Sequence, residues 1–163
     1  MLFRSGDVIE FTQLNPPKLR ILGRVGQSLN AFGEHFTQVE VDTAVTKVVR
    51  ETGCAVTDFA LTPVLISENG LPYHEWFIEF ENGGDAQKFS QRLDEVLCKQ
   101  NMCYDDLIRG KALNTLTINA LRRGTFKKMM IETGRAGTQY KTRRFIQTDE
   151  AQLLKKISES ITV

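Results

Sequence analysis

The fold can be read outward from one stretch, Thr37-Gln38-Val39-Glu40-Val41-Asp42-Thr43-Ala44-Val45-Thr46-Lys47-Val48-Val49. Thr37 followed three residues later by Glu40 is a capping box, a signature of a helix N-terminus. Apolar side chains then recur at steps of three and four residues and share one helix face: Val41, Ala44, Val45, Val48 and Val49. Gly53 is expected to end this helix.

Strand patterns lie on both sides of the helix. A short strand is expected at 28–32 before it, and residues 54–66, rich in β-forming types, follow it as a second strand. The turn Glu68-Asn69-Gly70 leads to a third, partly alternating strand, Tyr73-His74-Glu75-Trp76-Phe77-Ile78-Glu79-Phe80-Glu81.

A second helix and a fourth strand complete the pattern. The helix is capped by Asp85 and has an apolar stripe made of Phe89, Leu93, Val96 and Leu97. Residues 114–121 alternate as a strand, so the order is strand, helix, strand, strand, helix, strand, the split βαβ arrangement. The sequence therefore predicts an α+β fold: an antiparallel sheet with helices on one face. A helical stretch at 125–133 and an added C-terminal helix at 149–161 follow.

A small β-hairpin is expected before this unit, at 7–24, where Asn15-Pro16-Pro17 interrupts strand pairing. Asp7 follows a glycine at the edge of the hairpin, where a carboxylate can accept hydrogen bonds from two vicinal hydroxyls. Arg24, at the end of the second strand, could reach the same ligand or a phosphate. The alternative is a simple turn and a surface arginine, because short motifs often match by accident.

Composition excludes several classes of protein. The chain has 163 residues, 41% hydrophobic and 25% charged, as expected for one globular domain. No apolar run approaches the ~18 residues of a membrane span, and no leader pattern is present, so we expect a cytoplasmic protein without a membrane partner. Three cysteines and two distant histidines match neither a disulfide framework nor a metal site.

The net charge of +1 hides a segregated basic segment. Between Arg122 and Arg144 there are eight basic side chains and one acidic one, a net +7 that leaves −6 for the remainder. Near its end, a glycine-containing stretch leads to Lys141, Arg143 and Arg144, which could deliver a lysine to developing negative charge. A solvated basic loop explains the charge equally well. A nucleic-acid surface is a third alternative, since aromatic residues lie among the basic ones: Phe126, Tyr140 and Phe145.

Complete catalytic motifs are absent from the sequence. It has no Gly-x-x-x-x-Gly-Lys-Ser/Thr phosphate loop and no Gly-x-Gly-x-x-Gly, and two histidines offer no convincing Ser–His–Asp set. We therefore expect that the chain alone lacks a full catalytic apparatus.

Taken in order, the motifs resemble the end of adenylate-forming ligases. More specifically, the chain is similar to the auxin-responsive Gretchen Hagen family of acyl-acid amido synthetases, in its bacterial form. The segments that carry the resemblance are Arg4-Ser5-Gly6-Asp7, Leu22-Gly23-Arg24, Leu29-Asn30-Ala31-Phe32-Gly33-Glu34, Trp76-Phe77-Ile78-Glu79-Phe80-Glu81, Leu93-Asp94-Glu95-Val96-Leu97 with Tyr104, Gly124-Thr125-Phe126, and Gly137-Thr138-Gln139-Tyr140-Lys141-Thr142-Arg143-Arg144. One departure is Thr142-Arg143-Arg144, where the family often has a proline in Lys-x-Pro-Arg.

The resemblance implies roles for single residues. Asp7 would bind the ribose hydroxyls of ATP or of an acyl-adenylate, and Arg24 would lie beside the ribose. Lys141 would be the catalytic lysine that contacts the adenylate, with supporting contacts from Arg4, Arg143 and Arg144. ATP and Mg would bind only with a large N-terminal adenylation domain, and no metal is expected in this chain.

The resemblance also implies an organisation and a function. Residues 1–24 would form a hairpin that belongs to the end of a missing large domain, 25–27 a hinge, and 28–163 the C-terminal lid domain. The expected function is that of the mobile C-terminal domain of an ATP-dependent ligase that joins a carboxylic acid to an amine or amino acid, inactive without its large domain. The alternative is a free-standing ferredoxin-like module for small-molecule sensing or protein interaction. Nucleic-acid binding ranks lowest, because 114–121 lacks the paired aromatics of an RNA-recognition strand.

Overall fold

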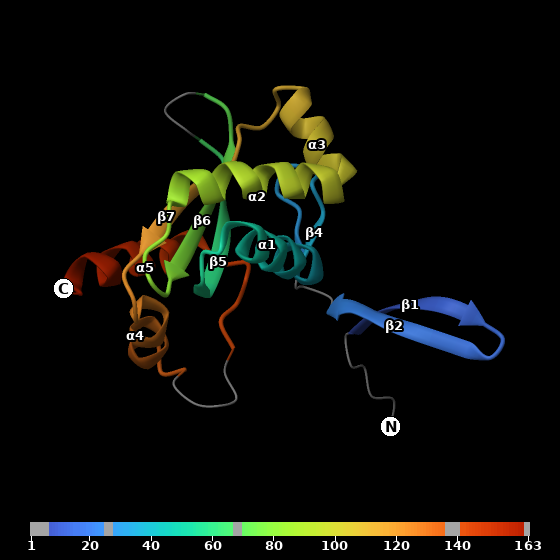
Figure 1. Ribbon diagram of the computed structural model, residues 1–163, viewed down its shortest axis with the longest axis horizontal. Coiled ribbons are helices and arrows are strands. Elements are labelled where there is room, and N and C mark those ends of the chain that lie inside the picture. The colour runs from blue at the N-terminus through green and yellow to red at the C-terminus, as the bar shows by residue number, and fades with distance from the viewer. Residues whose placement is uncertain (1–6, 25–27, 67–69, 136–140, 162–163) are drawn as a thin grey trace.

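The computed structural model describes residues 7–24, 28–66, 70–135 and 141–161, with only the backbone described for 7, 8 and 21–24. A β-hairpin formed by β1 (Asp7–Leu14) and β2 (Pro17–Arg24) projects from a mixed α/β body, as Figure 1 shows. The predicted hairpin is confirmed, with its strands paired antiparallel from Asp7 to Leu14.

A three-stranded sheet forms the centre of the body. It consists of β5 (Val56–Val64), β6 (Tyr73–Phe80) and β7 (Thr117–Leu121), in that order. β5 and β6 form an antiparallel pair, and β6 and β7 a parallel one. The parallel pairing follows from connectivity, because the chain returns through helix α2 (Ala86–Gln100) and two parallel strands need such a crossover.

The α+β class is confirmed, and two details of the predicted sheet are wrong. The sheet is mixed instead of antiparallel, and the strand expected at 28–32 does not enter it. Instead β3 (Ser28–Leu29) pairs with β4 (Phe36–Thr37) in a separate two-residue ladder. With no strand inserted between them, β6 and β7 pair directly.

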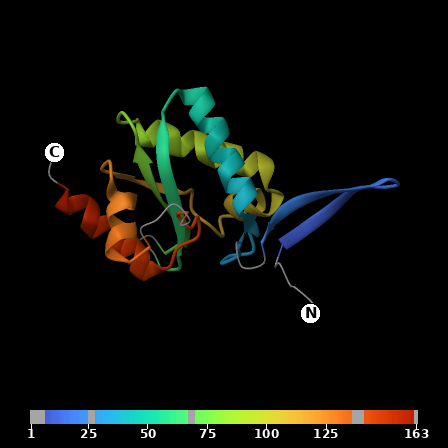
Figure 2. The ribbon, with the colours of Figure 1, turned by 90° about the horizontal axis from the view of Figure 1, so that it is seen from below.

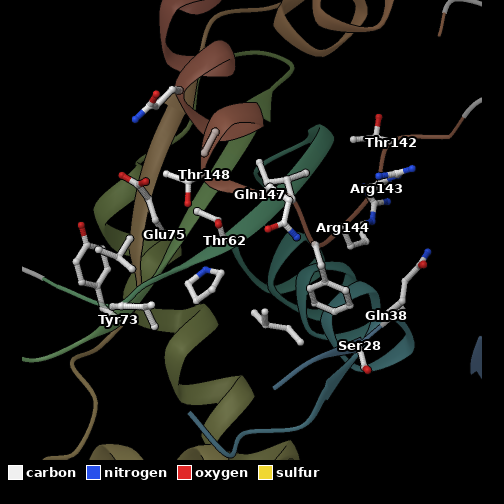
Figure 3. A pocket seen from close by; sticks show the side chains of 18 of the residues that line it. Ser28, Gln38, Thr62, Tyr73, Glu75, Thr142, Arg143, Arg144, Gln147 and Thr148 are labelled. Carbon is white, nitrogen blue, oxygen red and sulfur yellow. The ribbon is translucent and has the colours of Figure 1, made fainter. Parts of the chain in front are cut away.

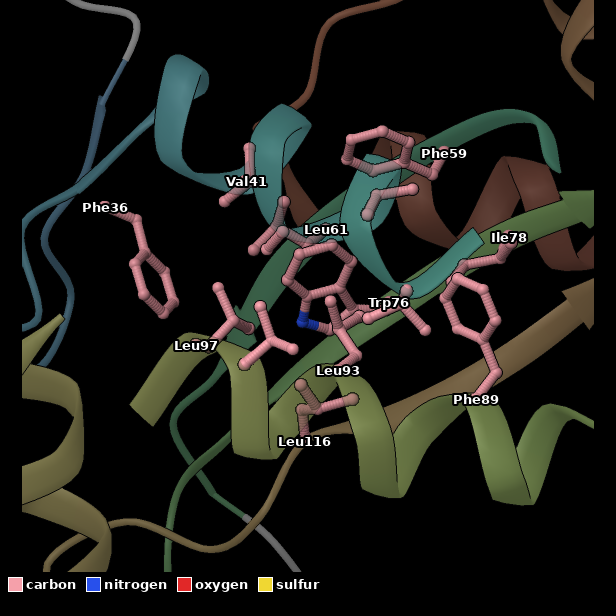
Figure 4. Close-up of a cluster of buried hydrophobic side chains, with 14 of the residues drawn as sticks. Phe36, Val41, Phe59, Leu61, Trp76, Ile78, Phe89, Leu93, Leu97 and Leu116 are labelled. Carbon is pink, nitrogen blue, oxygen red and sulfur yellow. The ribbon is translucent and has the colours of Figure 1, made fainter. Parts of the chain in front are cut away.

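One face of the sheet is covered by two helices, α2 and α1 (Gln38–Thr52). The capping box is confirmed: Glu40 N donates to Thr37 Oγ1 at 3.2 Å, and Thr37 N donates to Glu40 Oε2 at 2.8 Å. Gly53 ends α1 with φ 73°, as predicted. Figure 4 shows the core between the helices and the sheet, whose largest members include Phe36, Phe59, Leu61, Trp76, Ile78, Phe89, Leu93 and Leu97.

The opposite face of the sheet carries the C-terminal helices, α4 (Thr125–Glu132) and α5 (Thr148–Ser160). Side chains alternate along a strand, so Ala60 and Phe77 point to this second core while their neighbours point to the first. Figure 2 shows α4 and α5 on the side of the sheet away from α1. The added C-terminal helix is thus confirmed. In the part of the chain that is described, no helix is long and apolar enough to span a membrane.

Candidate functional site

Lys141 is exposed and lines an open groove of about 1580 Å³ on the body. Segments from α1, β5, β6, α5 and the 141–148 stretch meet there (Figure 3). Among the described residues, no ion pair or hydrogen bond engages the Lys141 ammonium. Lys141 is therefore available to a ligand, which the predicted catalytic role requires.

The segment after Lys141 is attached to the outer edge of β5. Leu61 N donates to Arg144 O at 2.7 Å, and Ile146 N donates to Leu61 O at 3.0 Å. Leu61 and Phe145 form an isolated parallel bridge. The chain next to Lys141 thus behaves as a short extra strand instead of a free loop.

Arg144 is bound inside the domain. Its Nε donates to Asp42 Oδ1 at 2.7 Å, and its Nη1 donates to Asp58 Oδ1 at 2.6 Å and to Phe59 O at 2.9 Å. The guanidinium carbon also lies 3.9 Å from the centroid of the Phe59 ring. Asp58 also accepts hydrogen bonds from the Phe59 amide, at 2.9 Å, and from the Thr142 hydroxyl. Arg143, by contrast, is exposed and lines the groove, without an ion pair in the described parts of the chain.

Across the groove from Arg143 lie Tyr73 and Glu75 (Figure 3). Glu75 Oε1 accepts from Lys155 Nζ at 2.7 Å and from Asn119 Nδ2 at 2.9 Å. The Glu75 and Lys155 charges therefore compensate each other. Apolar side chains at the rim remain exposed to water: Val39, Leu65 and Ile66.

Asp7 and Arg24 are brought together by the hairpin register, which pairs them directly across the two strands. Their side chains lie outside the described atoms, so their predicted contacts with a nucleotide stay predictions. Arg4 and the predicted hinge, 25–27, lie outside the described residues. In the described chain, no cluster of three or more His, Cys, Asp or Glu side chains suits a metal ion.

A buried acidic–imidazole pair was not foreseen from the sequence. Glu34 Oε1 lies 3.0 Å from His74 Nε2, and both side chains have 0% exposure. The Glu34 carboxylate also accepts from Ala31 N at 3.1 Å and Phe32 N at 2.8 Å. Burial raises the pKa of Glu34, but the hydrogen bonds from His74 and the backbone outweigh it and hold the pKa below 4.5. Glu34 belongs to a segment that carries the family resemblance, but its pairing with His74 is not visible in the sequence, because the two residues are 40 positions apart.

Asp94 and Tyr104, which carry part of the family resemblance, have a structural role. Tyr104 Oη donates to Asp94 Oδ1 at 2.6 Å inside the first core.

Of the three aromatic residues considered for base stacking, Phe126 is 3% exposed and Phe145 packs against the first core, while Tyr140 lies outside the described residues. Phe126 is thus not available to stack on bases and Phe145 is only partly exposed, which weighs against the nucleic-acid alternative.

Comparisons with known proteins agree with this arrangement. A family model described as the GH3 family C-terminal domain matches residues 39–150. The Oryza sativa subsp. japonica protein named jasmonoyl--L-amino acid synthetase GH3.5 is 26% identical over 177 residues, which cover 98% of this chain. The chain spans only 29% of the length of that relative.

Two solved structures share the fold. The AtGH3.15 acyl acid amido synthetase in complex with 2,4-DB matches with a TM-score of 0.73 and 18% identity, over 94% of this chain and 30% of its own. A 2-hydroxyisobutyryl-CoA ligase in the postadenylation state, in complex with R3-HIB-AMP, gives a TM-score of 0.53 and 19% identity, over 96% and 31%. Because the family match covers well over half of the sequence, this chain belongs to the GH3 family and corresponds to its C-terminal domain.

Proposed function

We propose that this chain serves as the C-terminal lid of an ATP-dependent, acyl-adenylate-forming ligase that conjugates a carboxylic acid to an amine or amino acid. In the first half-reaction the carboxylate attacks the α-phosphate of ATP, which gives acyl-AMP and releases pyrophosphate. In the second, the amine attacks the acyl carbon and AMP leaves. Mg²⁺ would accompany ATP, and we place the nucleotide and acid pockets in a large N-terminal domain.

The observation that carries this proposal is Lys141, a cation without a partner in the described parts of the chain, on an anchored segment of a GH3 C-terminal domain. An ammonium free of internal partners can stabilise negative charge that develops on the carboxylate and α-phosphate. Arg143, exposed beside it, would add a second positive charge. Asp7 and Arg24, paired at the open end of the hairpin, would meet the ribose.

The hairpin supports the division into 1–24, 25–27 and 28–163. Its described apolar side chains are largely exposed: Ile9 45%, Phe11 56%, Leu14 81% and Leu19 56%. A two-stranded hairpin is at best marginally stable in water without a surface to pack on. We therefore assign the hairpin to the large domain and the remainder, after the hinge, to the lid.

The described cysteines, Cys54, Cys98 and Cys103, are all free thiols, which supports the cytoplasm as compartment.

The test uses the chain joined to, or mixed with, the large domain encoded in the same genome. Adenylate formation is measured as acid-dependent exchange of pyrophosphate into ATP, and conjugation as amide formed with a panel of amino acids. We expect activity only with both parts present, and a loss of about 10²-fold in kcat for Lys141→Ala. Equal activity of the large domain without this chain, or an unaffected Lys141→Ala protein, would refute the proposal.

A further inference from the structure

Two ion pairs at the groove hold the chain beside Lys141 without involving Lys141 itself. We name the set formed by Asp42, Arg144 and Asp58 the Arg144 clamp. Its two carboxylates come from different elements, Asp42 from α1 and Asp58 from β5. Arg144 thus ties the segment to both the helix and the sheet.

The clamp is close enough to Lys141 to fix where its ammonium can reach. Lys141 and Arg144 are three residues apart, which is at most ~10 Å along an extended chain. Between them, the Thr142 hydroxyl donates to Asp58, and directly after them the backbone pairs with Leu61. Side chains and main chain therefore hold this segment together. The anchored backbone fixes the position from which the Lys141 side chain extends.

The charge of the clamp argues against direct contact of Arg144 with a phosphate. One guanidinium faces two carboxylates, so the set has a net charge of −1 and would repel an approaching anion. The Arg144 side chain is 21% exposed, and one face of its guanidinium lies over the Phe59 ring. To bind a nucleotide, Arg144 would have to give up several contacts and leave two acids unpaired.

We infer that Arg144 is a positioning residue: the Arg144 clamp holds the 141–146 segment against α1 and β5 and so sets the place of Lys141 in the adenylation step. This inference rests on the proposed role of Lys141. A misplacement of about 1 Å can cost about 10²-fold in rate, so loss of the clamp is expected to slow chemistry without weakening ATP binding.

The first experiment uses the 163-residue chain alone. Arg144→Ala should speed hydrogen–deuterium exchange at the Leu61 and Ile146 amides, whose acceptors lie across the clamped junction. The matched control is Arg92→Ala. Arg92 also bridges two carboxylates, Glu51 and Glu95, each at 2.5 Å, but it joins α1 to α2 far along the chain from Lys141. The control should leave both amides protected.

The second experiment measures pyrophosphate exchange in the assembled two-domain enzyme. Arg144→Ala and Asp58→Asn should each lower kcat by roughly 10- to 100-fold with the KM for ATP unchanged. Arg144→Lys should not restore the rate, because an ammonium cannot span two carboxylates as the guanidinium fork does. Arg92→Ala should retain the wild-type kcat.

The outcomes separate this inference from the proposed function. If Lys141→Ala is slow but Arg144→Ala, with faster exchange at Leu61 and Ile146, turns over normally, the clamp proposal is wrong and the function stands. A raised KM for ATP with rescue by Arg144→Lys would also overturn it, since Arg144 would then bind the nucleotide. A fully active Lys141→Ala enzyme would overturn both.

Discussion

The carboxylate of Glu34 lies 3.0 Å from the His74 ring nitrogen Nε2, with neither side chain exposed to solvent. This contact joins the loop between β3 and β4 to the first residues of β6. The aromatic rings of Phe32, Phe36 and Tyr104 surround His74 at centroid distances of 5.1–5.8 Å. Within the described atoms, His74 Nδ1 has no hydrogen-bond partner, so Glu34 supplies the ring with its polar contact.

Replacing Glu34 with alanine should strongly destabilise the body. The change removes the acceptor of the part-buried Ala31 and Phe32 amides and leaves His74 buried without its partner. Breaking a buried pair in this way typically costs about 3–5 kcal/mol. Denaturant unfolding followed by Trp76 fluorescence measures the change. Glu95→Ala is the control, because Glu95 is 58% exposed in its pair with Arg92 and such pairs contribute about 0–1 kcal/mol. Equal stability of the two variants would contradict the assigned role of Glu34.

The Glu34–His74 pair should also make stability depend on pH in acid. The pKa of Glu34 lies below 4.5 in the folded protein, so the unfolded chain takes up this proton first as pH falls. The stabilisation is thus present above pH 4.5 and is lost as pH falls through the lowered pKa. Free energies of unfolding measured across this range should show a shallower pH dependence for Glu34→Gln than for the wild type. The pKa of Glu51 is also lowered, through its hydrogen bond with Arg92, but that contribution is common to both proteins.

Local sequence signals located most elements, because the relevant physics is local. The capping box at Thr37 and the glycine at 53 bracket α1 as predicted. Helix α3 (Met102–Arg109) is not among the predicted elements. It has only eight residues, too few for a clear period, although Asn101 caps it by accepting from Tyr104 N at 2.9 Å.

The sequence did not predict which strands pair with each other or which distant side chains come into contact. Nothing local distinguishes a strand that enters the sheet from one that pairs as β3 does with β4. The same holds for the site: Lys141 was singled out by its motif, but the acids that hold Arg144 lie 102 and 86 positions away. Such contacts exist only once α1 and β5 have packed. The sequence motif therefore identifies Lys141 as a candidate, but it does not predict that Asp42 and Asp58 bind Arg144.

The cysteines should differ in reactivity. Burial, reinforced by the nearby Asp94 and Asp105 carboxylates, raises the pKa of the Cys98 thiol to about 11, and Cys98 is only partly exposed. Cys103 is exposed. Because the thiolate is the reactive form, an alkylating reagent at about pH 8 should modify Cys103 well before Cys98. Peptide mass analysis of a time course measures the alkylation rates of Cys103 and Cys98. In the control variant Cys103→Ser, the slower alkylation of Cys98 can be followed without the Cys103 reaction. Faster labelling of Cys98 would show that the α2–α3 junction opens in solution.

The apolar face of the hairpin should matter only in the complete protein. Phe11 and Leu19 are paired across the two strands, each is 56% exposed, and neither belongs to either core of the body. In the isolated chain, the double variant Phe11→Ser with Leu19→Ser should leave the unfolding midpoint of the body unchanged. Joined to the large domain, the same side chains would be buried, and their loss should destabilise that domain by about 1.5–3 kcal/mol for each residue. Met102→Ser is the matched control, since Met102 is 77% exposed on α3 in the body and should change neither protein. A drop in stability of the isolated chain would instead place the hairpin within the lid and shift the proposed boundary at 24.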